Sequence, residues 1–316
     1  MRNNILHITD IRTAATRIAP HVRRTPVMRC MHLEEMLGAE IFFKCENFQD
    51  MGAFKIRGAS NAIFSLADDI VAKGVSTHSS GNHGTAVALA AKRRGIAACV
   101  VMPENASAFK KRAVAENGAK IIYSESTMAG REAALARYVA ETGAAVVHPY
   151  NDLRVMAGQG TAALELHEEV PNLRVILVPV GGGGLLSGTA VATRQLRPDC
   201  KIIGIEPLGA DDAWRSLKAG HIEALAHPDT IADGLRATLG PLPFAVISEQ
   251  VDDIVRVSDE TIISAMRYIW ERMKIIIEPS SAVVVAALRE GLVEVKGRRV
   301  GVILTGGNVD LDHLPW

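Results

Sequence analysis

Apolar residues recur along most of the chain in two alternating patterns, short β-branched runs and longer amphipathic stretches, which are typical of strands and helices respectively. Between residues 75 and 147 the pattern predicts strands at 75–77, 97–102, 121–123 and 145–147. It predicts the helices between them at 85–94, 109–116 and 131–141, each followed closely by a glycine. Strands that alternate with helices of this length indicate βαβ units and a parallel sheet.

The same alternation flanks this region on both sides. Before it, the pattern predicts a helix capped by Asp10, a strand at 41–43 and a helix over Lys55–Phe64. After it, the pattern predicts a helix at about 155–169, a strand at 175–178, a helix that follows a glycine run, and strands at 201–205 and 300–304. We therefore expect two α/β sheets with a cleft between them, and functional residues at the carboxyl ends of the strands.

The charge balance excludes several classes of function. The chain has 316 residues, with 35 Lys and Arg against 35 Asp and Glu, and only 4% aromatic residues. Proteins that bind nucleic acids or anionic membrane surfaces need a basic face, so neither partner is expected. No apolar run approaches the ~18 residues of a transmembrane helix, and the N-terminal residues do not resemble a secretory signal.

Cysteine usage indicates a reducing compartment. Cys30, Cys45, Cys99 and Cys200 are far apart and form no C-x-x-C pair. This spacing argues against a disulfide scaffold or a thiolate zinc site, so a cytoplasmic protein is expected.

A run of four glycines, Gly181–Gly184, follows the strand at 175–178 and precedes a helix. Such a run can turn backbone N–H groups onto a phosphate at the helix N-terminus, or it can be merely a flexible turn. It matches neither a P-loop nor a good dinucleotide fingerprint. However, Glu206 ends the next strand, where a dinucleotide-binding fold keeps its ribose-binding acid, so a nicotinamide-binding oxidoreductase stays a distant alternative.

Two further segments add chemistry to the glycine run. Lys55 lies between glycines at a helix start, and Ser79–Gly84 forms a turn rich in N–H donors between a strand and a helix. Taken singly, they read as a solvated lysine and helix capping. Together with a phosphate cradle, they are what a pyridoxal phosphate site requires: a lysine for the Schiff base and a turn for the substrate carboxylate.

With these motifs, the sequence resembles the serine racemase and serine/threonine dehydratase family of fold-type II pyridoxal phosphate enzymes, which includes 3-hydroxyaspartate dehydratases. The resemblance extends from Thr25 to Leu311 and rests on seven motifs in order. These are 44–49, 52–58, 77–84, 157–160, 178–184, 231–234 and 277–280, and the resemblance closes on the segment 305–311.

The family resemblance implies the architecture and assembly. It implies an α/β, two-domain fold like that of the tryptophan synthase β subunit, with open parallel sheets flanked by helices. Residues 1–64 and 153–316 would form a discontinuous large domain that binds the cofactor, and residues 65–152 would form the small domain. The resemblance also implies a homodimer.

The resemblance assigns roles around the cofactor. Lys55 would form the Schiff base and take the Cα proton, with Ser80 as a second acid/base group on the opposite face. The cofactor would be bound by Phe54, Lys55, Asn82, Gly181, Gly182, Gly183, Gly184, Leu185 and Thr305. The substrate would be bound by Ser79, Ser80, Gly81, Asn82, His83 and Arg131.

The roles of Thr305 and Arg131 bear on the type of reaction and on the choice of substrate. Thr305 would place a hydroxyl against the pyridine nitrogen, and a hydroxyl, unlike a carboxylate, cannot hold that nitrogen protonated, which favours elimination. His78 and Tyr150 look like pocket neighbours with no assigned role. Arg131 is the type of residue that binds a second carboxylate, which would favour 3-hydroxyaspartate as substrate.

Glu206, Ala210 (through its carbonyl) and Asp212 resemble the family's divalent-cation site, suited to Mg²⁺ or to Ca²⁺ or Mn²⁺. From spacing alone, these acids read as helix-start residues. Met51 and Thr85 stand where nucleotide-binding relatives have other residues, so nucleotide activation is not expected. The sequence ends at Trp316, soon after the last motif, so feedback through a C-terminal regulatory domain is not expected either.

The predicted function is a pyridoxal phosphate-dependent dehydratase (ammonia-lyase) that converts L-serine or L-threonine to a 2-oxo acid and ammonia, with serine racemase activity as an added reaction. The first alternative is a 3-hydroxyaspartate dehydratase that uses Arg131. A β-replacement enzyme, a nicotinamide-binding oxidoreductase and a non-catalytic binding protein are the remaining alternatives.

Overall fold

The smaller of two parallel sheets lies between residues 75 and 146 of this computed structural model, which describes residues 5–79 and 81–316. Its strands follow the order β5-β4-β3-β6, and every pairing is parallel. They are β3 (Val75–His78), β4 (Ala98–Pro103), β5 (Lys120–Ser124) and β6 (Ala145–Val146). The crossovers are α5 (Asn82–Arg94), α6 (Ala108–Glu116) and α7 (Met128–Thr142).

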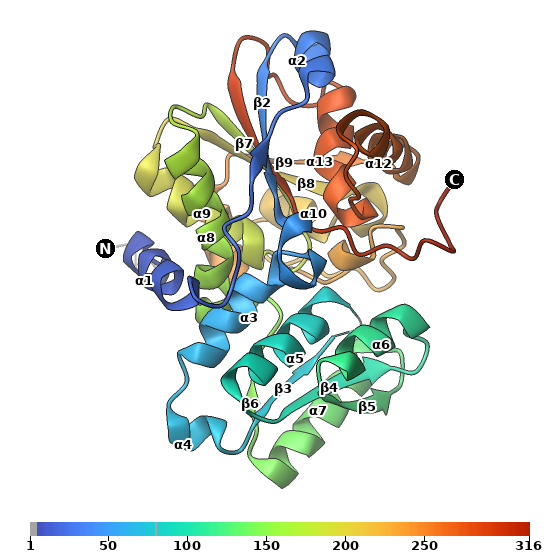
Figure 1. The fold of residues 1–316 in the computed structure, drawn as a ribbon. Coiled ribbons are helices and arrows are strands. Elements are labelled where there is room, and N and C mark those ends of the chain that lie inside the picture. Colours follow the sequence, from blue (N-terminus) through green and yellow to red (C-terminus); the bar gives the residue numbers. More distant parts are fainter. Residues whose placement is uncertain (1–4, 80) are drawn as a thin grey trace.

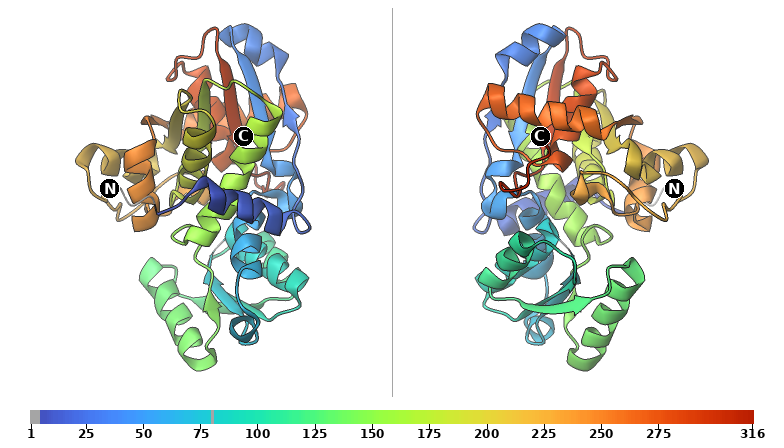
Figure 2. Two further views of the ribbon diagram at one scale, coloured as in Figure 1. Left: turned by 90° about the vertical axis from the view of Figure 1, so that its left-hand side faces the viewer. Right: turned by 90° about the vertical axis from the view of Figure 1, so that its right-hand side faces the viewer.

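Helices cover both faces of this sheet. Figure 2 shows α7 on one face and α5 on the other. All residues of β3 and β4 are buried as a result, which is typical of a parallel sheet enclosed between helix layers.

The larger sheet has six strands in the order β1-β2-β10-β7-β8-β9. They are β1 (Val27–Met28), β2 (Glu40–Cys45), β7 (Val175–Pro179), β8 (Lys201–Pro207), β9 (Asp253–Val257) and β10 (Arg299–Leu304). Only the edge pair β1–β2 is antiparallel. The last strand in the sequence, β10, therefore lies inside the sheet between β2 and β7 (Figure 1).

Alternate residues of each large-sheet strand enter different cores. In β2, Ile41 and Phe43 join one hydrophobic cluster and Phe42 joins the other, as the two-residue period of a strand requires. One cluster packs under α2 (Met31–Leu37), α12 (Asp259–Met273) and α13 (Pro279–Arg289). The other packs under α1 (Ile8–Ile18), α8 (Leu153–Glu169), α9 (Gly184–Leu196) and α11 (Pro241–Gln250). The remaining helices are α3 (Lys55–Phe64), α4 (Asp68–Val71) and α10 (Asp212–Ala219).

Two helices, α3 and α8, join the two sheets. They cross closely because glycines occupy the contact, where a Cβ on Gly158 would lie 2.6 Å from the Arg57 carbonyl oxygen. The fully buried Arg57 guanidinium donates to Glu46 at 2.7 Å and to Glu165 at 2.7 Å. Lys44 also donates to Glu165, at 2.6 Å. This buried charge network holds the helix that begins at Lys55 against both β2 and α8.

The expected α/β class with parallel sheets flanked by helices is confirmed. Most predicted elements are present within a few residues of their expected bounds. The first helix differs, because it begins at Ile8, and the Asp10 carboxylate accepts the His7 backbone N–H from within the first turn. Strand β9 and helices α10 to α13 were not predicted, although the buried residues of α12, Ile262, Ala265, Met266 and Ile269, recur at helical spacing. No helix among the described residues is long and apolar enough to cross a membrane. The division at residues 64/65 and 152/153 stays a prediction.

Candidate active site

Lys55 is the first residue of α3 and points toward the connection between the two sheets. Its Nζ donates a hydrogen bond to the Pro149 carbonyl oxygen at 2.9 Å and lies 5.1 Å from the centre of the Phe54 ring. Burial lowers the pKa of Lys55 to about 8, and the Glu278 carboxylate opposes this shift only in part. A lysine in this state supplies a neutral amine near physiological pH.

Thr305 follows the central strand β10 and lies next to the segment that carries Lys55. Its carbonyl oxygen accepts the Phe54 backbone N–H at 3.0 Å. Its side chain is only 3% exposed, and its hydroxyl has no hydrogen-bond partner among the described residues. A buried hydroxyl without a partner costs free energy, so it suggests that this hydroxyl hydrogen-bonds a ligand.

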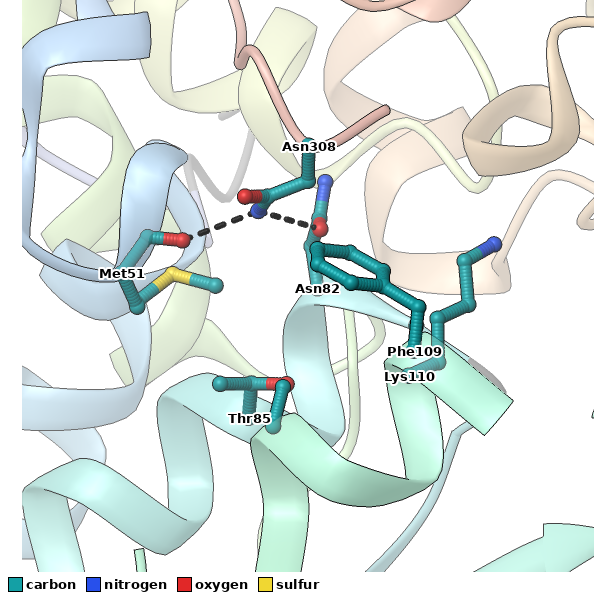
Figure 3. A pocket seen from close by; sticks show the side chains of 8 residues that line it. Met51, Asn82, Thr85, Phe109, Lys110 and Asn308 are labelled. Atoms are coloured by element: carbon teal, nitrogen blue, oxygen red, sulfur yellow. Dashed lines mark hydrogen bonds between the residues drawn. The ribbon is translucent and has the colours of Figure 1, made fainter. Parts of the chain in front are cut away.

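Asn82 begins α5 and is held by two residues from the opposite side of the cleft. Its Nδ2 donates to both carboxylate oxygens of Glu278, at 2.9 and 3.1 Å, and its Oδ1 accepts from Asn308 Nδ2 at 2.8 Å. Burial raises the pKa of Glu278 to about 7. Figure 3 shows Asn308 bridging Asn82 and the Met51 carbonyl beside a small cavity of about 30 Å³.

The expected carboxylate-binding turn is described only in part, because Ser80 lies outside the described residues. The Ser79 hydroxyl accepts the Gly81 backbone N–H at 3.2 Å. His83 is buried, and its Nε2 lies 3.0 Å from the Val147 carbonyl oxygen. Burial lowers the pKa of His83 well below its usual range, with the Lys55 cation as the next cause, so this imidazole is neutral.

The glycine run forms the tight turn that its sequence predicts. Gly183 has φ of +87°, and α9 begins at the next residue, so the first N–H groups of that helix have no intrahelical acceptor. The Tyr150 ring lies directly against Gly182, where an added Cβ would be 2.3 Å from the ring. Leu185 is buried in the first turn of α9. The arrangement fits an anion held by backbone N–H groups.

Tyr150, His78 and Arg131 lie along another side of the site. The cationic Arg131 contributes, after burial, to lowering the pKa of His78, and it opposes the burial that raises the pKa of Tyr150 to about 12. Arg131 itself is half-buried and donates only a weak hydrogen bond to the Thr127 carbonyl, at 3.4 Å. It forms no ion pair with any described residue.

The predicted metal ligands are linked to the glycine run through Leu239, which donates its backbone N–H to Asp212 and packs against Gly183. Glu206 and Asp212 are both buried, and Ala210 ends a short 3₁₀ turn between them. Glu206 accepts the backbone N–H groups of Ala213 and Trp214 at 3.1 and 2.7 Å. Burial and then the Asp212 charge raise the pKa of Glu206. Among the described residues, no group of three or more His, Cys, Asp and Glu side chains could hold a metal ion.

A ring of contacts brings most of the predicted cofactor residues together. Phe54 contacts Thr305, and the next residue, Gly306, accepts the Glu278 backbone N–H at 3.0 Å. Glu278 in turn holds Asn82. On the other side, Pro149 contacts Lys55 and the neighbouring Tyr150 packs on the glycine run. Arg131 borders this ring, and the predicted metal ligands lie outside it.

Sequence reasoning missed three residues that shape the site. Glu278 and Asn308 lie within motifs that the sequence marked, but their partner Asn82 is more than 190 positions away in the chain. His148 carried no signal, because a lone histidine after a short strand has no pattern to detect. Its contacts depend entirely on the path of the chain at that point.

The residues present fit pyridoxal phosphate. The glycine run turns into the N-terminus of α9 where an added Cβ on each glycine would lie 3.0 Å or less from a neighbouring residue. Among the described residues the buried Thr305 hydroxyl has no partner, and Lys55 has an amine with a lowered pKa. An anion cradle, a hydroxyl and a nucleophilic amine at one site match the phosphate, the ring nitrogen and the aldehyde of that cofactor.

Comparisons with known proteins agree with this chemistry. A family model described as "Pyridoxal-phosphate dependent enzyme" matches residues 18–306. The β-hydroxyaspartate dehydratase of Paracoccus denitrificans is 50% identical over 97% of this chain and 98% of its own length. The L-threo-3-hydroxyaspartate ammonia-lyase of Saccharomyces cerevisiae is 46% identical over 96% of this chain and 93% of its own. The solved structure of maize serine racemase superposes with a TM-score of 0.95 at 48% identity, covering 97% of this chain and 95% of its own.

Proposed function

This chain belongs to the pyridoxal-phosphate dependent enzyme family, and from that premise we propose that it is a dehydratase, an ammonia-lyase that converts β-hydroxy amino acids to 2-oxo acids and ammonia. L-serine, L-threonine and 3-hydroxyaspartate are the candidate substrates, and serine racemisation is a proposed added reaction. The observation that carries this proposal is Lys55, a lysine with a lowered pKa that lies in one ring of contacts with Thr305 and the glycine run.

The cofactor would be held by the ring of residues described above. Gly181–Gly184 and Leu185 would bind its phosphate, Phe54 would pack on its ring, and Asn82 and Thr305 would contact the ring oxygen and nitrogen. When bound, pyridoxal phosphate supplies an electron sink that stabilises negative charge at the substrate Cα. Family membership favours this ligand over a nicotinamide dinucleotide at the glycine run.

The protein's own groups would move the protons. With a pKa of about 8, roughly one Lys55 amine in ten is neutral at pH 7, and that form accepts the Cα proton. The Lys55 ammonium would return this proton to the β-hydroxyl, which leaves as water, and hydrolysis of the remaining enamine gives the 2-oxo acid and ammonia. We propose Ser80 as the acid/base group on the other face of the substrate, a role that racemisation requires, with Ser79, Gly81 and His83 completing the carboxylate-binding turn.

The first experiment measures 2-oxo acid release with pyridoxal phosphate and Mg²⁺ present. L-serine, D-serine, L-threonine and the 3-hydroxyaspartate isomers are compared side by side. We expect turnover on at least one of them and none in Lys55→Ala. Cofactor-dependent turnover that survives in Lys55→Ala would overturn the proposal.

A second candidate function, selectivity for 3-hydroxyaspartate, is favoured by Arg131. This half-buried cation borders the site and forms no ion pair within the part of the chain that the structure describes, so the second carboxylate of a dicarboxylic substrate would supply a partner for it. We expect Arg131→Met to lower kcat/KM for 3-hydroxyaspartate by roughly 10- to 150-fold and to change kcat/KM for L-serine by no more than a few-fold. Equal losses on both substrates would contradict a role in selectivity.

We also propose a divalent-cation site at Glu206, Ala210 and Asp212, filled by Mg²⁺ or by Ca²⁺ or Mn²⁺. A cation there would relieve the repulsion between the two buried carboxylates. Asp212 also accepts the Leu239 backbone N–H at 2.7 Å, and Leu239 packs against Gly183, so the ion would brace the glycine run. Chelator treatment is expected to lower thermal stability, and Mg²⁺ is expected to restore it.

Two proposals concern assembly and location. The family resemblance implies a homodimer, which light scattering at micromolar concentration tests directly. All four cysteines are free and buried, which suits a reducing, cytoplasmic setting.

A further inference from the structure

Residues 147–152 form the connection that leaves β6 of the smaller sheet and enters α8 beside the larger one. This connection passes between the two sheets at the site itself. It has no regular secondary structure. The Val147 N–H donates to the Ser76 carbonyl at 2.9 Å, but the N–H groups of Tyr150 and Asn151 need acceptors from outside a helix or sheet.

His148 supplies those partners. Its Nδ1 accepts the backbone N–H of Asn151 at 2.9 Å and lies 3.3 Å from the backbone N–H of Tyr150. Because both groups are donors, Nδ1 is the unprotonated nitrogen and the ring proton is on Nε2. The imidazole therefore acts as an Asn or Asp side chain does when it accepts N–H groups two and three residues further on.

The residues inside this turn contact the predicted cofactor groups on both sides. The Pro149 carbonyl accepts from Lys55 Nζ at 2.9 Å. The Tyr150 ring covers Gly182. The Asn151 side-chain oxygen accepts the Leu242 backbone N–H at 3.0 Å in the first turn of α11, and the N–H of Gly240, the N-cap of that helix, donates to the Gly182 carbonyl at 3.2 Å. A change in this turn would therefore displace both the Pro149 carbonyl, which accepts from Lys55, and the Tyr150 ring, which packs on Gly182.

The surroundings of His148 keep its Nδ1 free to accept. The ring meets His78 of β3 edge to face, with centroids 5.7 Å apart, and meets Tyr150 likewise at 4.7 Å. The other charged groups that face it are Lys55 from α3 and Asp152 at the start of α8. Burial, then His78 and Lys55, lower the pKa of His148 to about 4, while Asp152 opposes them. The imidazole is therefore neutral throughout the physiological range.

We propose that His148 is a positioning residue, whose Nδ1 orders the turn that presents the Pro149 carbonyl to Lys55 and the Tyr150 ring to the glycine run. The proposal rests on the proposed role of Lys55 and the glycine run in holding the cofactor. It assigns His148 no contact with the reacting atoms.

Two matched variants test separately the hydrogen-bond acceptor and the aromatic ring of His148. His148→Phe keeps an aromatic ring against His78 and Tyr150 but removes the acceptor, whereas His148→Asn removes the ring and keeps an acceptor. We expect His148→Phe to weaken pyridoxal phosphate binding by the apoprotein about tenfold or more, and His148→Asn to stay within about threefold of wild type. Wild-type affinity in His148→Phe, or an equal loss in both variants, would overturn the proposal.

Labelling of Lys55 tests the same turn without the cofactor. The pH midpoint for acylation of Lys55 in the apoprotein is expected to fall by about one unit in His148→Phe, because the Lys55 ammonium loses the Pro149 carbonyl as its acceptor. In His148→Asn we expect the midpoint to be unchanged. An unchanged midpoint in His148→Phe would contradict the proposal. If wild-type protein bound no pyridoxal phosphate, the proposed function would fail alone, and this labelling would still decide the role of His148.

The ¹⁵N resonances of His148 provide a measurement on the unaltered protein, in case His148→Phe does not fold. We expect an unprotonated Nδ1 and a protonated Nε2 at pH 7. A proton on Nδ1 would show that the turn is held in some other way.

Discussion

At the scale of single residues, the site is defined by polar groups in unusual states. Within residues 5–79 and 81–316, the enclosed Lys55 amine has no carboxylate at contact distance, the buried Thr305 hydroxyl has no hydrogen-bond partner, and Arg131 has no ion pair. Each state costs free energy in a folded protein. Their concentration in one region is the physical signature of a place built for ligand chemistry.

The titration of Lys55 gives a direct test. Its pKa is lowered to about 8, so the neutral, reactive amine accumulates as pH rises through 8, far below the range of an ordinary lysine. We expect acylation of Lys55 in the apoprotein, followed by peptide mass spectrometry, to show a midpoint near pH 8. The exposed Lys218 serves as the internal reference, and a Lys55 profile that matches that of Lys218 would contradict the burial argument.

Sequence alone could predict those residues whose roles follow from local motifs. Lys55 and Gly181–Gly184 each lie in a short segment whose spacing indicates chemistry. Glu278 and His148 could not be found in this way, because their roles come from partners that only the fold brings near. Whether Ser80 has its predicted role stays a prediction.

At the scale of elements, the turn from β7 into α9 has little freedom to vary. Gly183 combines a left-handed backbone with close neighbours, because an added Cβ would lie 2.5 Å from Leu239 and 2.7 Å from Pro243. The same turn bears the N-terminus of α9, whose first backbone N–H groups can bind an anion.

Substitution of Gly183 by alanine tests this turn. We expect Gly183→Ala to weaken pyridoxal phosphate binding by more than tenfold, because the strain and the clash both displace the cradle. Gly118→Ala is the matched control, since Gly118 also has a left-handed backbone (φ of +80°) but no neighbour within 4 Å and lies outside the site. Titration of the cofactor into both apoproteins measures the difference, and similar affinities would argue against the cradle.

Helix α3 depends on the buried charge network beneath it. Arg57→Met would leave Glu46 and Glu165 short of their main cationic partner, and we expect the free energy of unfolding to fall by about 3–5 kcal/mol. Arg131→Met, which breaks no ion pair with a described residue, is the control and should cost much less. Urea unfolding of the two variants gives the comparison, and equal losses would show that the network adds no stability.

At the scale of the whole molecule, the two-sheet α/β architecture was predictable because strands and helices alternate with clear periods over most of the chain. The regions that escaped prediction have physical reasons. Strand β9 reads Asp-Ile-Val-Arg-Val, whose charged residues interrupt the apolar run, and α11 is apolar around most of its circumference. The antiparallel edge strand β1 has only two residues, so its direction could not be inferred.

Acid stability is a property of the whole fold that buried histidines control. Burial lowers the pKa of His167 to about 4, so between pH 6.5 and 4 the unfolded chain binds a proton that the native state does not. The free energy of unfolding must therefore fall as pH decreases through this range, by at most about 1.4 kcal/mol per pH unit for one such group. His148 adds to the effect in the same direction.

The variant His167→Gln measures how much of this pH dependence comes from His167. Gln removes the titrating group but can still hydrogen-bond the Thr193 hydroxyl, which lies 3.0 Å from His167 Nε2. We expect the variant to lose less stability than wild type between pH 6.5 and 5, as measured by urea unfolding at each pH. If the free energy of unfolding fell equally with pH in both proteins, a group other than His167 would be responsible for the proton uptake.

The interior position of β10 has a consequence for how the protein is made. The strand at 299–304 fills the gap between β2 and β7, and Thr305 directly follows it. During synthesis from the N-terminus, the contiguous sheet at 75–146 can form as soon as it leaves the ribosome, whereas the larger sheet must wait for residues 299–304. Competence to hold the cofactor is thus acquired only after β10 has emerged.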